Sequence, residues 1–89
     1  MTARYTIAVS RPAEKQIRAL DPQVRARIEK TIDGLAENPR PHACQEMHGH
    51  ENLYRARTGD WRVVYEIRDN VLLVLVVAVG HRREIYREL

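Results

Sequence analysis

Three arginines, Arg55, Arg57 and Arg62, flank a Gly59-Asp60 pair and are the residues of this sequence with the clearest chemical potential. If Gly59 and Asp60 form a two-residue hairpin turn, glycine in the first central position is typical of type II′. Arg57 then lies opposite Arg62, and Arg55 shares their face because strand side chains alternate. Like charges paired across strands are destabilising. The pattern therefore predicts an anion site between the guanidiniums, and the alternative is a solvated, exposed sheet face.

A second polar group, His81, Arg82, Arg83, Glu84 and Tyr86, follows the most apolar stretch of the chain. Histidine exchanges protons near neutrality, arginine binds phosphate, and tyrosine can donate a proton or stack on a base. We expect this cluster to join the three arginines around one phosphodiester, with Arg83 as a further phosphate ligand. The alternative is a polar C-terminal tail.

Four side chains that can ligate zinc lie close together in the sequence: His42, Cys44, His48 and His50. Their spacing matches no standard zinc finger. The simpler interpretation is that the histidines are solvated loop residues, and metal binding stays open. The sequence also lacks a Gly-rich phosphate loop, a G-x-S-x-G motif and a catalytic carboxylate pair. Kinase, serine hydrolase and glycosidase activities therefore have no support.

Length and composition indicate one domain, with 89 residues, 44% of them hydrophobic and 30% charged. The net charge of +3 comes almost wholly from arginine, since Lys15 and Lys30 are the only lysines. Arginine suits phosphate, which favours nucleic acid as a partner, although an acidic protein fits as well.

The cellular compartment is suggested by three weak signals. A single cysteine, Cys44, excludes an intramolecular disulfide and fits a reducing cytoplasm. The first residues lack the apolar core of a signal peptide, and the apolar run over 71–79 is too short to span a bilayer. We therefore expect a cytoplasmic protein that does not bind membranes.

The elements that position these groups follow from periodicity. We expect a strand over 5–9, then a helix capped by Ser10 with Pro12 in its first turn. Asp21-Pro22 repeats the signal and begins a second helix, which Asn38-Pro39 ends. Its apolar stripe consists of Val24, Ile28, Ile32 and Leu35. Residues 39–52 are expected to be an irregular segment, either functional or mobile.

The remaining chain predicts a three-stranded antiparallel meander, with turns at 58–60 and 69–70 and a last strand over 71–79. That strand is apolar throughout, so both of its faces should be covered. The helix hairpin can cover one face, and we expect a partner protein to shield Leu73, Leu75 and Val77 on the other. The predicted fold is a single α+β domain over 1–89, with an N-terminal strand and both helices on one sheet face.

The chain resembles the RelE/ParE superfamily of bacterial toxins from toxin–antitoxin pairs, and within it the RelE branch. The order of elements carries the resemblance over essentially the whole chain. Three segments add to it: Asn38-Pro39-Arg40-Pro41, residues 53–65 (LYRARTGDWRVVY) and residues 79–86 (VGHRREIY). The resemblance implies the fold of small microbial ribonucleases, with substrate on the sheet face away from the helices. It also implies metal-independent cleavage of messenger RNA, in which a 2′-hydroxyl attacks the adjacent phosphate and leaves a 2′,3′-cyclic phosphate and a 5′-hydroxyl.

The same resemblance assigns roles by position. Arg62 matches the arginine that stabilises the transition state, and Arg55 and Arg57 match two basic positions on the preceding strand. Arg82 matches a phosphate-binding arginine, and Tyr86 matches a catalytic or base-stacking tyrosine.

The general base is left open, because some members use a lysine where this chain has Arg57. Arginine does not release its proton at workable pH, so Arg57 can bind phosphate but hardly abstract a proton. His81 falls where some relatives carry a general-acid histidine and is the first expectation for the base. Glu46, in the long loop, is the alternative.

The expected function is therefore the toxin of a type II toxin–antitoxin pair, an endoribonuclease that inhibits translation without a cofactor. Its expected partners are a cognate antitoxin protein, messenger RNA and the ribosome. The alternatives are a ParE-like inhibitor of DNA gyrase and an inactive antitoxin-binding corepressor module. His81, Arg82 and Tyr86 favour the nuclease, since a gyrase inhibitor needs no such cluster.

Overall fold

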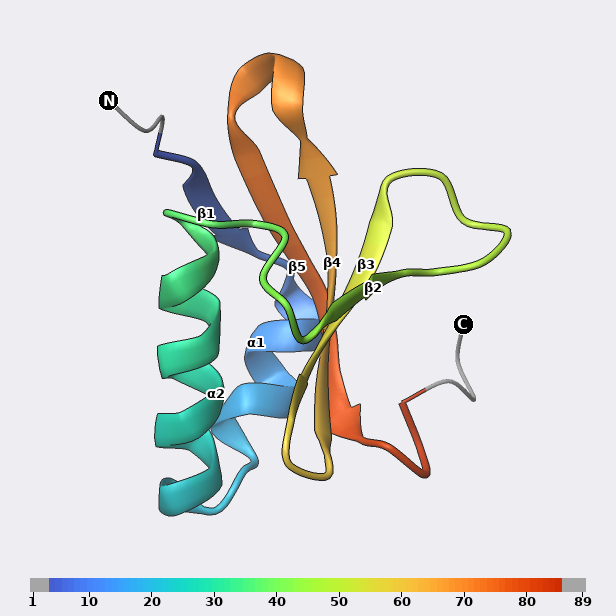
Figure 1. Ribbon diagram of the computed structural model, residues 1–89. Coiled ribbons are helices and arrows are strands. Elements are labelled where there is room, and N and C mark those ends of the chain that lie inside the picture. The colour runs from blue at the N-terminus through green and yellow to red at the C-terminus, as the bar shows by residue number, and fades with distance from the viewer. Residues whose placement is uncertain (1–3, 86–89) are drawn as a thin grey trace.

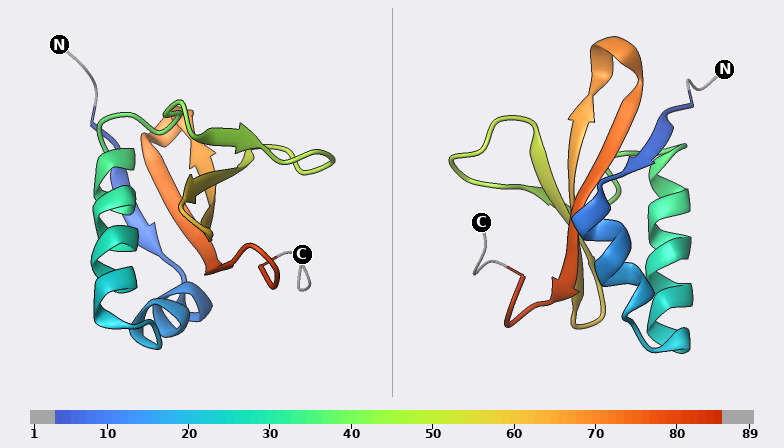
Figure 2. Two further views of the ribbon diagram at one scale, coloured as in Figure 1. Left: turned by 60° about the horizontal axis from the view of Figure 1, so that its bottom comes forward. Right: turned by 180° about the vertical axis from the view of Figure 1, so that it is seen from behind.

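A five-stranded mixed sheet in the order β1-β5-β4-β3-β2 forms one layer of the computed structural model, and two helices cover one of its faces (Figure 1). The structure describes residues 4–85. The strands are β1 (Thr6–Val9), β2 (Cys44–Glu46), β3 (Leu53–Thr58), β4 (Trp61–Arg68) and β5 (Leu73–His81), and the helices are α1 (Arg11–Arg18) and α2 (Pro22–Leu35). Seen from behind, both helices still lie on the same side of the sheet (Figure 2). The predicted α+β architecture is confirmed.

Both helices begin where the sequence indicates. The Ser10 hydroxyl accepts a hydrogen bond from the Ala13 N–H at 3.3 Å, which caps α1. α2 begins at Pro22, although the Asp21 side chain makes no capping bond. It ends at Leu35, earlier than the expected stop at Asn38-Pro39, because the next residues form tighter i→i+3 bonds such as Ala36 N–H to Asp33 O at 3.2 Å.

The hydrophobic core lies between α2 and the centre of the sheet. The stripe residues Ile28, Ile32 and Leu35 are buried, as the helical spacing predicts. On the sheet, the buried residues of this core alternate along the strands and include Val63, Tyr65, Ile67, Val74, Val76 and Val79. Among the described residues, no helix is both long and apolar enough to cross a membrane.

The pairing of β1 was not predicted. It runs parallel to β5, with Thr6 opposite Leu73 and Val9 opposite Val76, and so becomes one edge of the sheet. The other edge is β2, which lies within the segment predicted to be irregular. β2 pairs with β3 over three residues, too few for an alternation pattern to appear in the sequence.

The last strand is displaced by two residues from its predicted limits. Asp69–Val71 form a short 3₁₀ turn and Leu72 has a left-handed φ of +51°, so β5 begins at Leu73 and continues to His81. It carries a β-bulge, because Tyr65 pairs with Val76 and Val64 with Ala78, which leaves Val77 as the extra residue. Leu73 and Leu75 remain half-buried on the face away from the helices.

Candidate nucleic-acid interface

The hairpin between β3 and β4 places the arginines as predicted. Thr58 pairs with Trp61 and Arg57 with Arg62, which leaves Gly59 and Asp60 as a two-residue turn. Gly59 has a φ of +61°, and Asp60 does not share a positive φ, the combination that defines type II′. The prediction that Arg57 faces Arg62 is therefore confirmed.

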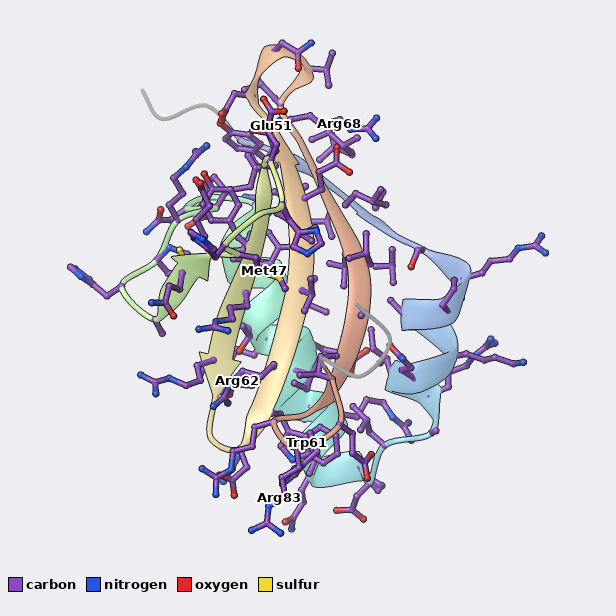
Figure 3. The ribbon with its side chains drawn as sticks, turned by 90° about the vertical axis from the view of Figure 1, so that its right-hand side faces the viewer. Met47, Glu51, Trp61, Arg62, Arg68 and Arg83 are labelled. Atoms are coloured by element: carbon purple, nitrogen blue, oxygen red, sulfur yellow. The ribbon has the colours of Figure 1, made fainter. Side chains whose placement is uncertain are left out.

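The three arginines line a common groove of about 430 Å³ on the sheet face away from the helices. Figure 3 looks onto this face, with Arg62 in its lower half and α2 behind the strands. The second wall of the groove lies beside β3 and consists of His42, Ala43, Cys44 and Gln45. Three guanidiniums in one open groove form a site suited to a phosphate backbone.

Arg62 is held by main-chain groups of its own hairpin. Its Nη1 donates to the Gly59 carbonyl at 3.0 Å and to the Trp61 carbonyl at 2.9 Å. Within residues 4–85 no carboxylate forms an ion pair with Arg62. On the neighbouring strand, Arg55 Nη2 donates to Gln45 Oε1 at 2.6 Å. Arg62 is thus oriented by neutral acceptors and keeps its full positive charge for a ligand.

The wall that contains His42 is a turn over residues 41–44, which is hydrogen-bonded to the main chain of β3. The Cys44 N–H donates to the Pro41 carbonyl at 3.0 Å, and the Arg57 N–H donates to the Ala43 carbonyl at 3.2 Å. His42 lies inside this turn with an exposed side chain. The turn therefore sets the position of His42 relative to Arg57.

The residues just before the turn are anchored to the rest of the sheet. Arg40 binds Asp69 through two bonds of 3.2 and 2.8 Å and lies 5.2 Å from the centre of the Tyr54 ring. The hydrogen bond from Arg40, followed by that from Tyr5, lowers the pKa of the Asp69 carboxyl. The buried Tyr65 hydroxyl donates to the Pro39 carbonyl at 2.7 Å. The segment predicted to be irregular is thus fixed to the sheet by hydrogen bonds and forms part of the site.

Burial dominates the electrostatics of Tyr65. Burial, and then the neighbouring Cys44 side chain, raise the pKa of its phenol well above the ordinary tyrosine range. The phenol therefore stays protonated and keeps donating to the Pro39 carbonyl at any physiological pH.

His81 is not brought to the arginine groove. It pairs with Trp61, whereas Arg62 pairs with Gly80, so His81 and Arg62 point to opposite faces of the sheet. The His81 and Trp61 rings meet edge to face at 5.5 Å. His81 lines a separate groove of about 420 Å³ beside α1. The expected convergence is wrong because β5 includes position 81, which subjects its side chain to the alternation of the strand.

Glu46, the alternative base, also faces away. It pairs with Tyr54, whereas Gln45 pairs with Arg55, so that Gln45 and not Glu46 shares the arginine face. Sequence reasoning missed Gln45 and the site position of His42, because the three-residue strand that follows the turn carries no periodic signal.

The remaining candidates lie near the end of the hairpin or beyond the described residues. The Arg82 N–H donates to the Asp60 carbonyl at 2.8 Å, and Arg82 Nε lies 3.5 Å from Asp60 Oδ1. Arg83 is exposed, and its N–H donates to His81 Nδ1 at 3.2 Å. In Figure 3 Arg83 lies near Trp61, below Arg62. Tyr86 lies outside the described residues.

The four possible zinc ligands belong to two different parts of the surface. His42 and Cys44 line the arginine groove, whereas His48 and His50 line a hollow in the β2–β3 loop. Over residues 4–85, no three His, Cys, Asp or Glu side chains form a group that could hold a metal ion.

Solved structures of toxin–antitoxin complexes share this arrangement. The chain is similar to one in the crystal structure of the intact Escherichia coli RelBE toxin–antitoxin complex, with a TM-score of 0.77, 28% identity, and coverage of 86% of this chain and 95% of that one. A chain of the archaeal RelE–RelB complex from Pyrococcus horikoshii OT3 has a TM-score of 0.80 at 23% identity, covering 91% of this chain and 98% of that one, which shows a shared fold.

Sequence comparison defines the class. Residues 7–86 match the family described as the ParE toxin of the type II toxin–antitoxin system parDE. The chain therefore belongs to the RelE/ParE superfamily of type II toxins. It is 31% identical over 88 residues to the mRNA interferase toxin RelE of E. coli strain K12, covering 94% of this chain and 92% of that protein. It is 30% identical over 84 residues to the toxin RelE of Mycobacterium tuberculosis H37Rv, covering 93% and 87% of the two chains.

Proposed function

We propose that this toxin is an endoribonuclease that cleaves messenger RNA on the ribosome and so inhibits translation in the cytoplasm. The observation that carries the proposal is the groove in which Arg55, Arg57 and Arg62 meet on an open sheet face. The similarity to a RelE protein named as an mRNA interferase supports RNA as the substrate.

The chemistry follows from what guanidiniums can do. When a 2′-hydroxyl attacks the adjacent phosphate, negative charge builds up on the non-bridging oxygens. Arg62 is already oriented by two main-chain carbonyls, so it can stabilise that charge without reorganising. Arg55 and Arg57 bind the flanking phosphates, and the products are a 2′,3′-cyclic phosphate and a 5′-hydroxyl. Removing one such charge-stabilising group typically lowers a rate by about 10²–10³.

We also propose that a cognate antitoxin protein neutralises the toxin by covering the arginine face. RelE chains of this fold have been solved with RelB, including the E. coli complex. Half-buried Leu73 and Leu75 extend the open sheet face beyond the arginines and offer the antitoxin an apolar contact.

The proposal is tested by incubating the purified toxin with messenger RNA on programmed ribosomes, and separately with free RNA, and mapping the new 5′ ends. We expect cuts within codons, with ends that require phosphorylation before they can be ligated. Arg62→Ala should lower the cleavage rate by about 10²–10³ while the variant still folds and binds antitoxin. Arg68→Ala is the matched control, because Arg68 lies on the same face of β4 but pairs with Glu66 at 2.7 Å outside the groove.

Metal independence has its own test. The RNA substrate is made with a sulfur atom in place of a non-bridging oxygen at the cleaved phosphate. The cleavage rate of this substrate is then measured with and without cadmium, to see whether cadmium restores any rate that the sulfur has removed. The proposal expects no recovery, because guanidiniums and not a metal ion contact that oxygen. Recovery by a thiophilic metal would contradict this part of the proposal.

A second candidate function is inhibition of DNA gyrase, which the match to the ParE family favours. Under this alternative the toxin would leave RNA intact and block DNA supercoiling by purified gyrase. If the same toxin preparation cleaves RNA but leaves the supercoiling activity of gyrase unchanged, inhibition of gyrase is excluded.

A further inference from the structure

The arginine groove contains several phosphate ligands but few groups that can accept a proton. Attack by a 2′-hydroxyl requires such a group, and guanidinium and amide side chains do not serve. Of the described residues that line the groove, only His42 and Cys44 carry a side chain whose chemistry includes proton exchange without a guanidinium or an amide. Cys44 packs against the core and contacts Tyr65. This leaves the imidazole of His42.

His42 lines the same groove as the arginines and is held there by its turn. Its turn is closed by the bond from Cys44 N–H to Pro41 O, and the turn is tied to β3 by the bond from Arg57 N–H to Ala43 O. Arg57, proposed above to bind phosphate, and the turn that carries the imidazole are therefore joined by a main-chain hydrogen bond. The His42 side chain is exposed, so substrate and solvent can both reach it.

We propose that His42 is the general base of the reaction, an inference that rests on the proposed RNA cleavage. The imidazole takes the proton of the 2′-hydroxyl while O2′ forms its bond to phosphorus. The P–O5′ bond breaks, O5′ leaves with the bonding electron pair and takes a proton from water. The imidazolium then returns its proton to the hydroxide left behind, so that protons and charge balance over the cycle.

The other side chains that line the groove decide whether a pH–rate profile can report on His42 alone. The arginines are Arg55 and Arg57 from β3 and Arg62 from β4, and Cys44 and Gln45 line the groove on the same segment as His42. No carboxylate from the described part of the chain lines the groove. A change in the acid limb of the pH–rate profile on mutation of His42 is therefore not masked by a neighbouring acid.

The experiment compares His42→Ala and His42→Gln with wild type in the ribosome and free-RNA assays, as single-turnover rates across pH. We expect both variants to lose about 10²–10⁴-fold in rate, to lose the acid limb of the profile, and to bind a 2′-deoxy substrate as tightly as wild type. Added imidazole should restore part of the rate to His42→Ala, because the groove is open, and none to Arg62→Ala. His48→Ala and His50→Ala are matched controls, since both histidines line a different hollow.

The possible outcomes separate this inference from the function on which it rests. A wild-type toxin that cleaves, with a His42→Ala variant that cleaves as fast or that differs only in substrate affinity, overturns the role of His42 and leaves the nuclease intact. A reduced rate with an unchanged pH profile and no response to imidazole also overturns it. A wild-type toxin that cleaves neither substrate overturns both proposals.

Discussion

Arg62 and His81 lie one residue out of register on adjacent strands, and their side chains point to opposite faces of the sheet. Arg62 pairs with Gly80 and His81 with Trp61, so the alternation of β4 and β5 separates the guanidinium from the imidazole. His81 therefore lies on the strand next to Arg62, but not on the face of the sheet that carries the arginines.

This separation predicts that His81→Ala keeps near wild-type cleavage of RNA. The substitution should instead lower the free energy of unfolding, because the variant loses the edge-to-face contact with the Trp61 ring, whose centre lies 5.5 Å from that of His81. Such a contact contributes about 0.5–1.5 kcal/mol to the free energy of unfolding. Trp61 is the only tryptophan, so its fluorescence during urea unfolding measures the change directly. A large loss of rate at unchanged stability would show that His81 reaches the substrate after all.

The sequence was sufficient to predict the arginine groove but not its opposite wall. Gly59 in the first central position favours a two-residue turn with Asp60, and that turn pairs Arg57 with Arg62, so this contact could be predicted from residues close in sequence. The position of His81 depended on where β5 ends. β5 ends two residues later than predicted because it also begins two residues later, after a 3₁₀ turn and a left-handed Leu72. Leucine seldom adopts this conformation, so the residue types of the segment do not predict it.

The position of His42 was hidden for a different reason. It depends on β2, a three-residue strand whose pairing with β3 is a tertiary contact rather than a periodic pattern. The bracing by Arg40 and Asp69, 29 residues apart, is likewise visible only once the strands have been placed.

The pairing of Arg57 with Arg62 predicts a conflict between stability and binding. Replacing exposed Arg57 by threonine removes the cross-strand repulsion and adds a good strand former, so Arg57→Thr should raise the free energy of unfolding by about 0.2–1 kcal/mol at low salt. The same variant should bind RNA more weakly, with a shallower dependence of affinity on salt. Thermal melting in increasing sulfate checks the reason: sulfate should stabilise wild type more than the variant. Equal sulfate responses would mean that the two guanidiniums do not share an anion.

The buried phenol of Tyr65 predicts both a mutational and a pH effect. Tyr65 is 0% exposed and donates to the Pro39 carbonyl at 2.7 Å, so Tyr65→Phe should destabilise the fold by about 1–3 kcal/mol through an unsatisfied buried carbonyl. Because burial raises the pKa of Tyr65 in the folded state, the unfolded chain loses its proton first. Stability should therefore fall as pH rises above the ordinary tyrosine value of 10.0, and less steeply in Tyr65→Phe. Urea unfolding between neutral and alkaline pH measures both slopes. Tyr54→Phe is the control, because Tyr54 is half-buried beside Tyr65 but its hydroxyl accepts from exposed Arg40 at 3.3 Å and binds no buried carbonyl.

The last prediction concerns Asp69, which connects the stability of the fold to the position of the proposed base. The Arg40 bond lowers the pKa of Asp69 when the chain is folded, so its stabilising effect is present above the ordinary value of 3.8 and is lost as pH falls through the lower folded value. Asp69→Asn should therefore melt below wild type at neutral pH, and the two melting temperatures should converge in strong acid.

Because Arg40 directly precedes the turn that carries His42, Asp69→Asn should also speed amide exchange over residues 40–44 and lower the RNA cleavage rate without changing any residue of the groove. Glu37→Gln is the control, since Glu37 pairs with Arg4 at 3.3 Å in a more exposed position away from the groove. If Glu37→Gln and Asp69→Asn slow cleavage equally, the Arg40–Asp69 pair has no special part in holding the turn.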